Sequence, residues 1–454
     1  MLLSASHYRE LAREADRFVQ SLRVDTPSGI RWQRTDSPKA RADLSLYHGS
    51  AGVLLQQLEW FAATGDEGYL ELASRAGDDL VASVRDATPS VGLFDATPGQ
   101  AFALIELWRA GGKVEYRDAA GRLLQALREA ALPLGAGIGW VEPDPFKDIT
   151  GAEGEREIFD QSVGACGAAM VFLHAHRLGV HPDALQWAID AADRLIEVAE
   201  REPYGWRWQL MADMPYVFRA PNFAHGSAGV AYLLADLYRT TNDPRHLIAA
   251  QAGARFVQHA AVTVGDGCLV RHTEDDEPAI FYLGVCHGPA GTGRLFHLLH
   301  DITDDASYLA TADALLRGVM ATGVPEVRID GFWNNHGQCC GDAGLGDYLL
   351  FLYQRSGDAA ALELAGRMAT VIEERSEVRL VTVDGRQVQG RCWAQAEHRN
   401  RPDFLQTATG LFQGAAGIGS FLLHLATTLE GRPVKIALPD QPFTDGPFAR
   451  GGGA

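Results

Sequence analysis

Three cysteine thiols stand at matching positions in two similar segments of this sequence. Cys286 lies in VCHGPAG, and Cys339 and Cys340 are adjacent in QCCGDAG. In both segments a Gly-x-x-Gly element follows the cysteines within two residues, so the thiols meet if the two segments lie side by side. Zinc favours thiolate ligands, and three protein ligands leave a fourth position open, as in catalytic zinc sites. The spacing predicts a Zn²⁺ site at Cys286, Cys339 and Cys340, although buried cysteines are also common as small apolar residues.

The remaining cysteines, Cys166, Cys268 and Cys392, do not share this register, and we expect them to be apolar packing residues. Six cysteines in 454 residues show no disulfide-scaffold spacing. Neighbouring cysteines such as Cys339 and Cys340 are also poorly placed to bond to each other. The thiols are therefore expected to be reduced.

The Gly-x-x-Gly element recurs along the whole chain, roughly every 50 to 70 residues. Its second glycine is found at Gly52, Gly99, Gly167, Gly229, Gly291, Gly344 and Gly417. In the second copy Ala96 replaces the first glycine. A period of this length built from helix pairs indicates a helical repeat protein.

An apolar run follows each element, with apolar residues recurring every three or four positions, which predicts a helix. A turn and a second amphipathic helix follow each of the first six runs. An N-terminal helix at about residues 5–22 is expected to be the partner of the first inner helix, giving seven pairs. All seven inner helices then begin at the same end of the protein. Because the N-terminal helix can close against the seventh pair, we predict an all-α toroid rather than an open stack.

The bulk composition excludes several classes of partner. The formal net charge is −18, which disfavours nucleic acid. The N-terminus reads as an amphipathic helix rather than a signal peptide, and no apolar run approaches the roughly 20 residues that span a bilayer. We expect a cytoplasmic protein with no membrane insertion. Residues 1–436 are predicted to form one domain with long irregular connections, and residues 437–454 a flexible tail.

The seven elements, together with CHGPAG followed by CCGDAG and with HGSAG in the fourth copy, resemble the lanthionine synthetase C-like (LanC-like) family. The resemblance covers about residues 5–430. It implies an α/α toroid of seven inner and seven outer helices with a zinc ion at one rim. The usual ligands in that family are Cys, Cys and His, but Cys340 stands at the histidine position here. The chain therefore resembles the Cys-Cys-Cys variants among the bifunctional lanthipeptide synthetases.

Two further positions match the family. His225 precedes the glycine of the fourth copy, where the family has its active-site histidine, and Asp160 corresponds to an acidic residue near the metal. Val285 stands where a tryptophan usually precedes the first ligand. The resemblance implies zinc-dependent addition of a cysteine thiol to dehydroalanine or dehydrobutyrine. His225 would protonate the α-carbon, and Asp160 would accept the thiol proton or orient a neighbour. Three thiolates and Zn²⁺ sum to −1, so the substrate thiolate should be held less tightly and be more reactive.

Several alternatives remain open from the sequence. The substrate can be a dehydrated precursor peptide, supplied by a separate dehydratase, or a small thiol such as glutathione added to dehydroamino acids in proteins. A zinc-containing peptide-binding scaffold without turnover is the third interpretation. Other polar residues near the elements are candidates for supporting roles: His48, His287, Asn335, His336 and Asp347.

Overall fold

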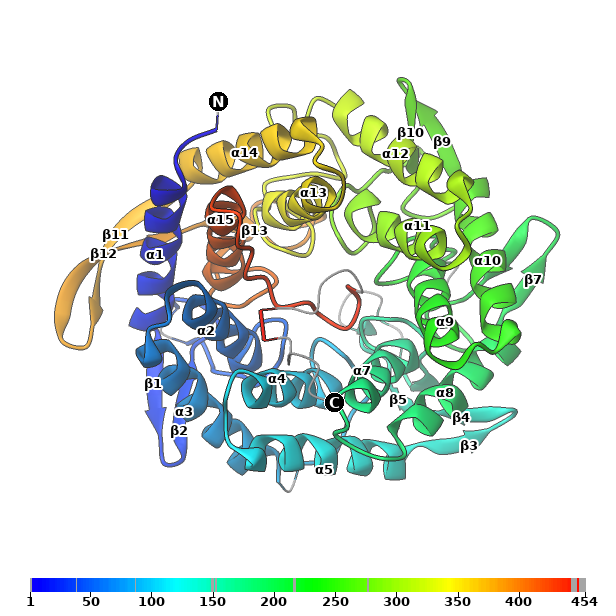
Figure 1. The fold of residues 1–454 in the computed structure, drawn as a ribbon, viewed down its shortest axis with the longest axis horizontal. Coiled ribbons are helices and arrows are strands. Elements are labelled where there is room, and N and C mark those ends of the chain that lie inside the picture. Colours follow the sequence, from blue (N-terminus) through cyan, green and yellow to red (C-terminus); the bar gives the residue numbers. More distant parts are fainter. Residues whose placement is uncertain are drawn as a thin grey trace.

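The computed structural model describes residues 2–37, 39–85, 87–147, 151, 153–214, 218–275, 277–441 and 447–448. Within these residues fourteen α-helices form two concentric rings (Figure 1). The inner ring consists of α2 (Ser50–Thr64), α4 (Thr97–Arg109), α7 (Ala165–Arg177), α9 (Ser227–Thr241), α11 (Pro289–Thr303), α13 (Asp342–Ser356) and α15 (Ala415–Leu429). The outer ring consists of α1 (Ala5–Ser21), α3 (Glu67–Val84), α5 (Val114–Ala130), α8 (Ala184–Val198), α10 (Pro244–His259), α12 (Ala306–Ala321) and α14 (Ala359–Glu374). The predicted α/α toroid of seven inner and seven outer helices is confirmed.

One detail of the predicted pairing is wrong. Helices α2 to α14 pair as expected, each outer helix following its inner partner, but α1 packs against α15, the last inner helix, and not against α2. The contact is close because Gly419 of α15 faces α1; a Cβ at this glycine would stand 3.0 Å from the Cβ of Ala15. The first helix of the chain therefore closes the toroid against the seventh pair.

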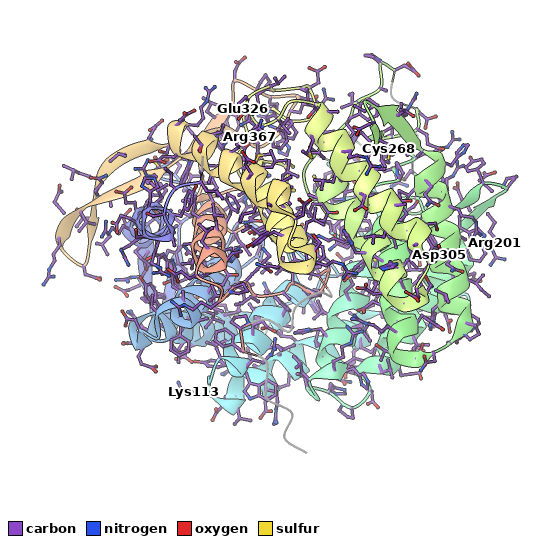
Figure 2. The ribbon with its side chains drawn as sticks, turned by 45° about the horizontal axis from the view of Figure 1, so that its top comes forward. Lys113, Arg201, Cys268, Asp305, Glu326 and Arg367 are labelled. Atoms are coloured by element: carbon purple, nitrogen blue, oxygen red, sulfur yellow. The ribbon has the colours of Figure 1, made fainter. Side chains whose placement is uncertain are left out.

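The two rings differ in polarity as their positions require. In α15 every residue from Ala415 to Thr428 is buried, because an inner helix is covered on all sides. The outer helix α12 buries only a stripe at helical spacing, which includes Tyr308, Ala312 and Leu315. Charged side chains cover the outer surface, where Arg367 pairs with Glu326 (Figure 2). No helix of the described residues is long and apolar enough to cross a membrane.

The connections are more regular than the expected irregular loops. In the described residues they contain seven two-stranded antiparallel sheets. Their strands are β1 (Arg23–Thr26), β2 (Gly29–Trp32), β3 (Leu132–Leu134), β4 (Gly137–Gly139), β5 (Val141–Pro143), β6 (Glu155–Glu157), β7 (Glu200–Glu202), β8 (Gly205–Arg207), β9 (Ala261–Val264), β10 (Gly267–Val270), β11 (Glu377–Val383), β12 (Arg386–Cys392), β13 (Ala394–Ala396) and β14 (Leu405–Thr407). The longest hairpin, β11–β12, turns at Asp384 and Gly385, both with positive φ. An Asp-Gly pair between β-branched runs is the sequence signal for such a turn.

The recurring glycines allow the loop before each inner helix to pack directly against the first turn of that helix. The loop folds back so that N–H groups of the first helical turn donate to carbonyls seven residues earlier, as Ala165 does to Ile158 (2.9 Å) and Ser227 to Ala220 (3.0 Å). A Cβ at the second glycine would stand 1.7 to 2.3 Å from the carbonyl oxygen six residues earlier in all seven copies. Only glycine permits this close backbone approach.

The seven loops are joined to each other by a closed circle of backbone hydrogen bonds, which we call the rim ring. Each member lies five residues before a second glycine, and its N–H donates to the carbonyl of the next member over 2.8 to 3.3 Å. The members are Tyr47, Phe94, Ser162, Ala224, Cys286, Cys339 and Phe412, and the N–H of Phe412 donates back to Tyr47. The rim ring holds the loops of all seven copies at one end of the toroid.

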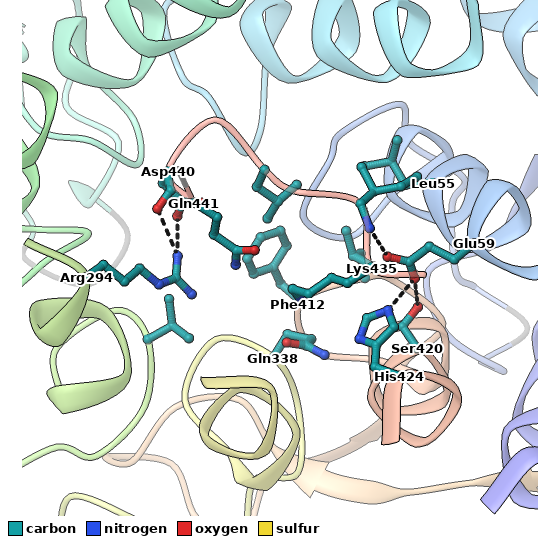
Figure 3. Close-up of a pocket in the computed structure, with 14 residues that line it drawn as sticks. Leu55, Glu59, Arg294, Gln338, Phe412, Ser420, His424, Lys435, Asp440 and Gln441 are labelled. Atoms are coloured by element: carbon teal, nitrogen blue, oxygen red, sulfur yellow. Dashed lines mark hydrogen bonds and ion pairs between the residues drawn. The ribbon is translucent and has the colours of Figure 1, made fainter. Parts of the chain in front are cut away.

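The chain after α15 turns back into the centre of the toroid (Figure 1). There Lys435 pairs with Asp347 (2.5 Å), and His424 bridges Asp347 (2.8 Å) and Glu59 (3.0 Å). Further along, Asp440 is buried and pairs with Arg294 of α11 (3.0 Å; Figure 3). Only about 30 Å³ of cavity remains between these groups. The predicted domain boundary after residue 436 falls inside this segment, and residues 442–446 and 449–454 of the predicted tail lie outside the described residues.

We expect Gly99→Ala to destabilise the protein by about 1–3 kcal/mol, because the new Cβ would stand 2.1 Å from the carbonyl oxygen of Leu93. Gly121→Ala is the matched control, since Gly121 lies within α5 and its added Cβ would meet nothing closer than 3.5 Å. That variant should keep or raise stability, as alanine favours helices over glycine. Denaturant unfolding measures both, and equal stability of the two variants would contradict the role assigned to the repeat.

The central ion pairs make stability depend on pH. Although burial lowers the pKa of His424, Asp347 and Glu59 raise it to about 9. The folded protein therefore holds this proton more tightly than the unfolded chain, a stabilisation of about 3 kcal/mol that is fully present below pH ~6.5 and lost as pH rises through ~9. We expect the difference in thermal midpoint between the wild type and His424→Gln to be largest at pH 6 and to shrink towards pH 10. A difference independent of pH would show that His424 is not charged in the fold.

Candidate metal centre

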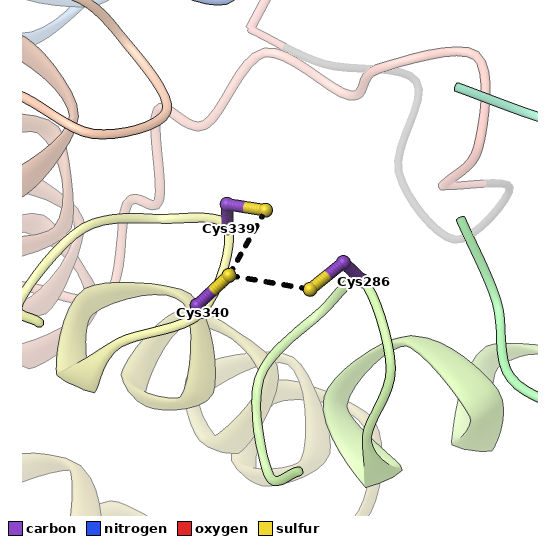
Figure 4. Close-up of side chains that lie close together, drawn as sticks. All are labelled: Cys286, Cys339 and Cys340. Carbon is purple, nitrogen blue, oxygen red and sulfur yellow. Dashed lines mark hydrogen bonds between the residues drawn. The ribbon is translucent and has the colours of Figure 1, made fainter. Parts of the chain in front are cut away.

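The rim ring brings the three predicted cysteine ligands together. Cys286 precedes α11, Cys339 and Cys340 precede α13, and the N–H of Cys286 donates to the carbonyl of Cys339 (3.3 Å). The Sγ of Cys340 lies 3.3 Å from that of Cys286 and 3.4 Å from that of Cys339 (Figure 4). All three sulfurs lie within 4.8 Å of one another, and in the described part of the chain they are the one group of this kind that can hold a metal.

The geometry and chemistry of these sulfurs fit Zn²⁺. Tetrahedral ligation with Zn–S bonds of about 2.3 Å separates neighbouring sulfurs by roughly 3.8 Å, close to the separations observed here. Cys286 and Cys340 are buried, whereas Cys339 is half-buried and, like Cys286, lines a cavity. Three thiolates would complete one side of a tetrahedron, and the cavity leaves a fourth direction for a substrate atom.

The surroundings favour a negative charge on Cys339. Hydrogen bonds from Cys286 and Cys340 lower the pKa of the Cys339 thiol well below its usual range, and the Tyr47 hydroxyl acts in the same direction. The pKa values of the other two thiols are raised well above their usual range, that of Cys286 first by its hydrogen bond to Cys339 and that of Cys340 first by its hydrogen bond to Cys286. Of the three thiols, Cys339 is therefore the one that loses its proton most readily. The N-terminus of α13, which follows Cys340 directly, also favours a thiolate.

The predicted catalytic pair lies at the cavity that Cys286 and Cys339 line. The Nδ1 of His225 lies 2.5 Å from Oδ2 of Asp160, whose other oxygen accepts the backbone N–H of Val163 (2.8 Å). Asp160 is buried, and His225 lines the same cavity as Cys286 and Cys339. Burial lowers the pKa of His225, but the Asp160 carboxylate raises it more, so the net shift is upward. His225 is therefore fixed in orientation and inclined to hold a proton.

The cavity itself is a product of the repeat. It has a volume of about 530 Å³, and every one of the seven copies contributes a residue that lies four or five positions before its second glycine. These residues are Tyr47, His48, Phe94, Asp95, Ser162, Val163, Ala224, His225, Cys286, Cys339 and Phe412. Because the rim ring passes through the positions five before each glycine, the side chains of these loops converge on one space.

The other candidate residues have varied positions. His48 lines the cavity and its Nε2 contacts Glu397 (3.3 Å). The ring of His287 lies 5.3 Å from that of His225, and burial followed by the charges of His272 and His225 lowers its pKa well below the usual range. Burial therefore disfavours a charged His287, whereas the pKa of the neighbouring His225 is shifted upward.

Three candidates lie away from the cavity wall. His336 is buried and bonds Asp342 at the start of α13 (2.6 Å). Asn335 donates to Gln413 (2.7 Å), whose amide nitrogen is 4.0 Å from the Cys340 sulfur, so it supports a ligand indirectly. Asp347 belongs to the central ion pairs described above.

Cys166, Cys268 and Cys392 are separate from the metal centre. Cys166 is buried in α7, Cys268 lies on β10 at the outer edge (Figure 2) and Cys392 ends β12. None of the six cysteines forms a disulfide.

Asp95 and Glu397 were not predicted as site residues. Although Asp95 is open to the cavity, the loss of surrounding water raises the pKa of its carboxyl to about 6, and the charge of Asp160 adds to this effect. The position of Asp95 in the repeat could have identified it, because Asp95 stands four residues before Gly99 as His225 does before Gly229. Glu397 comes from the loop between β13 and β14, outside the repeat, and no pattern marked it.

The α/α toroid with a cysteine centre at one rim defines a class of protein, and comparison with known proteins specifies it. The model of the family described as lanthionine synthetase C-like protein matches residues 41–435, so the chain belongs to that family. Among solved structures, nisin cyclase is similar with a TM-score of 0.58 at 14% identity, covering 93% of each chain. D-mannose isomerase has a TM-score of 0.49 at 12% identity, covering 93% of this chain and 97% of its own. No curated protein matches in sequence.

We expect the purified protein to contain about one zinc per chain, and Cys286→Ser or Cys340→Ser to reduce this to a small fraction because structural thiolates dominate the affinity. Cys268→Ser is the matched control, since Cys268 lies on β10 and should be dispensable for the metal. Elemental analysis by mass spectrometry measures the zinc content. A wild type without zinc, or a triple variant of the ligand cysteines that retains it, would refute the assignment.

Proposed function

We propose that the protein is a zinc-dependent cyclase that adds a cysteine thiol to dehydroalanine or dehydrobutyrine in a modified peptide, forming a thioether. The observation that carries this proposal is that Cys286 and Cys339, two of the three clustered cysteines, line one cavity with His225, which is bound to Asp160. Membership of the lanthionine synthetase C-like family and the fold similarity to nisin cyclase support it.

The reaction needs a thiolate and a proton donor. Cys286, Cys339 and Cys340 would hold Zn²⁺, which when bound would supply the thiolate by lowering the pKa of a substrate thiol. When the sulfur bonds to the β-carbon, the electron pair of the C=C bond moves towards the α-carbon, which must then gain a proton. Because Nδ1 of His225 is engaged by Asp160, Nε2 is the free donor and delivers that proton.

The residues around His225 keep it in the donor state. Asp160 stabilises the imidazolium, and the Cys339 thiolate acts in the same direction. Asp95 lies on the same wall with a pKa near 6, so it can take up the proton released by the substrate thiol at neutral pH. The product is a thioether with no net change in mass. The dehydrated residue must come from a separate dehydration reaction.

The filled centre of the toroid favours a peptide that enters the cavity as a loop over one that passes through the toroid. The C-terminal segment closes the centre of the toroid, where only about 30 Å³ is free. A peptide therefore enters and leaves the 530 Å³ cavity from the rim side. The addition of a small thiol to a dehydroamino acid uses the same groups, and experiment distinguishes the two reactions.

A synthetic peptide with one cysteine and one dehydroalanine tests the proposal. We expect the zinc-loaded protein to remove the alkylatable thiol without a mass change, as read by mass spectrometry after alkylation. His225→Asn should slow this cyclisation about 10²- to 10⁴-fold by removing the proton donor. His300→Asn should leave the rate unchanged, because His300 lies in the last turn of α11, at the end away from Cys286.

A cysteine-free dehydrated peptide incubated with glutathione is the second arm. A glutathione-sized adduct, with no cyclisation in the first arm, would favour the intermolecular reaction. If neither product forms with zinc-loaded protein, the cyclase proposal is wrong and a peptide-binding scaffold remains.

A further inference from the structure

A second cavity opens beside the site cavity at the same end of the toroid. It has a volume of about 400 Å³ and lies between α3, α5 and the first turn of α4. Asp95 and Gln100 line both cavities, so the two meet there. On the basis of the cyclase function proposed above, we infer that this second cavity, the flanking groove, binds the stretch of substrate peptide next to the reacting residues and selects acidic segments.

The shape and lining of the flanking groove suit a peptide. Val81 and Val84 of α3 and Leu123 of α5 form apolar walls, and Gln100 offers a polar group. A volume of a few hundred Å³ with apolar walls and a few polar groups is typical of a ligand site. A free inorganic anion would use none of the apolar surface. A peptide that reaches the sulfurs from the rim has its neighbouring residues at the junction.

The charge of the flanking groove determines which peptide it fits. Arg85, at the end of α3, and Arg122, on α5, line it and are exposed, and neither is paired with a carboxylate in the described residues. The acidic Asp95 lies at the junction with the site cavity, so the two arginines are the charged groups of the rest of the groove. On the same two helices, Arg75 pairs with Asp25 and Arg117 with Asp118, each at 2.7 Å.

Two exposed guanidinium groups thus line one groove of a chain whose net charge is −18. Guanidinium groups bind carboxylates through paired hydrogen bonds. Because Arg85 and Arg122 belong to different helices, they can contact carboxylates at two points along one peptide. Glutamate or aspartate residues flanking the ring-forming segment are therefore the matching substrate feature.

The test uses three synthetic peptides that share one cysteine and one dehydroalanine and are extended by three Glu, three Gln or three Lys residues. We expect the wild type to cyclise the Glu peptide with a KM roughly five- to tenfold below that of the Gln peptide, as two exposed ion pairs allow. Arg85→Glu/Arg122→Glu should abolish this preference or reverse it towards the Lys peptide, with kcat unchanged.

The matched control is Arg75→Glu/Arg117→Glu, which changes the net charge by the same amount on the same two helices, outside the flanking groove. It should keep the preference for the Glu peptide. Equal KM values for the three peptides with the wild type, or loss of preference in both double variants, would overturn the proposal while the cyclase function stands.

Binding distinguishes failure of this inference from failure of the proposed function. A fluorescent Glu peptide carrying serine and alanine in place of cysteine and dehydroalanine cannot react, and its affinity is read by anisotropy. If no peptide is cyclised but this probe binds the wild type and not Arg85→Glu/Arg122→Glu, the groove assignment holds and the cyclase proposal fails. Equal binding to both proteins, or displacement by inorganic phosphate at concentrations comparable to the peptide, would refute an acidic-peptide site.

Discussion

The rim ring is the constraint on which the rest of the structure depends. One backbone hydrogen bond contributes only about 0.5–1.5 kcal/mol, so seven of them are a small part of the stability of a toroid of this size. Their effect is geometric. A circle that closes from Phe412 to Tyr47 requires all seven loops at one height, and it makes consecutive members neighbours in space. Cys286 and Cys339 are adjacent in that circle although 53 residues separate them in sequence.

Closure of the circle requires the toroid to close, and apolar packing achieves this. Helix α1 lies against α15 with Gly419 at the contact, so the two ends of the chain of helices are joined. The C-terminal segment then fills the centre, where Lys435 and His424 offset the charges of Asp347 and Glu59. Buried carboxylates are costly unless paired, and these four groups are balanced. The result is a cavity that is closed towards the centre of the toroid and has the candidate site residues at the rim.

The sequence predicted the toroid and the three sulfurs because both are set by local register. Each loop requires a glycine where the backbone approaches a carbonyl, so the glycines recur in the sequence as a repeat. Cys286 and Cys339 occupy the same position in their copies of this repeat. The hairpins were missed because their strands are mostly three or four residues long, although Asp384–Gly385 was a readable turn. The partner of α1, the Lys435–Asp347 pair and the contact of Glu397 with His48 join residues far apart in the chain, and no local pattern encodes them.

The repeated loop also explains how Cys340 can stand where the family resemblance places a histidine without altering the fold. The position four before the second glycine carries His48, Asp95, Val163, His225, His287, Cys340 and Gln413 in the seven copies. The backbone there is held by the loop and the neighbouring rim ring, not by the side chain, so its residue type is free to follow chemistry. With a metal ion bound, a thiolate at Cys340 instead of an imidazole would add one negative charge to the centre. His225 lies on the cavity that Cys339 lines, and its pKa is raised first by Asp160 and then by Cys339. In the proposed reaction, a centre made of thiolates and a histidine that holds its proton firmly would both favour attack by sulfur followed by protonation of carbon.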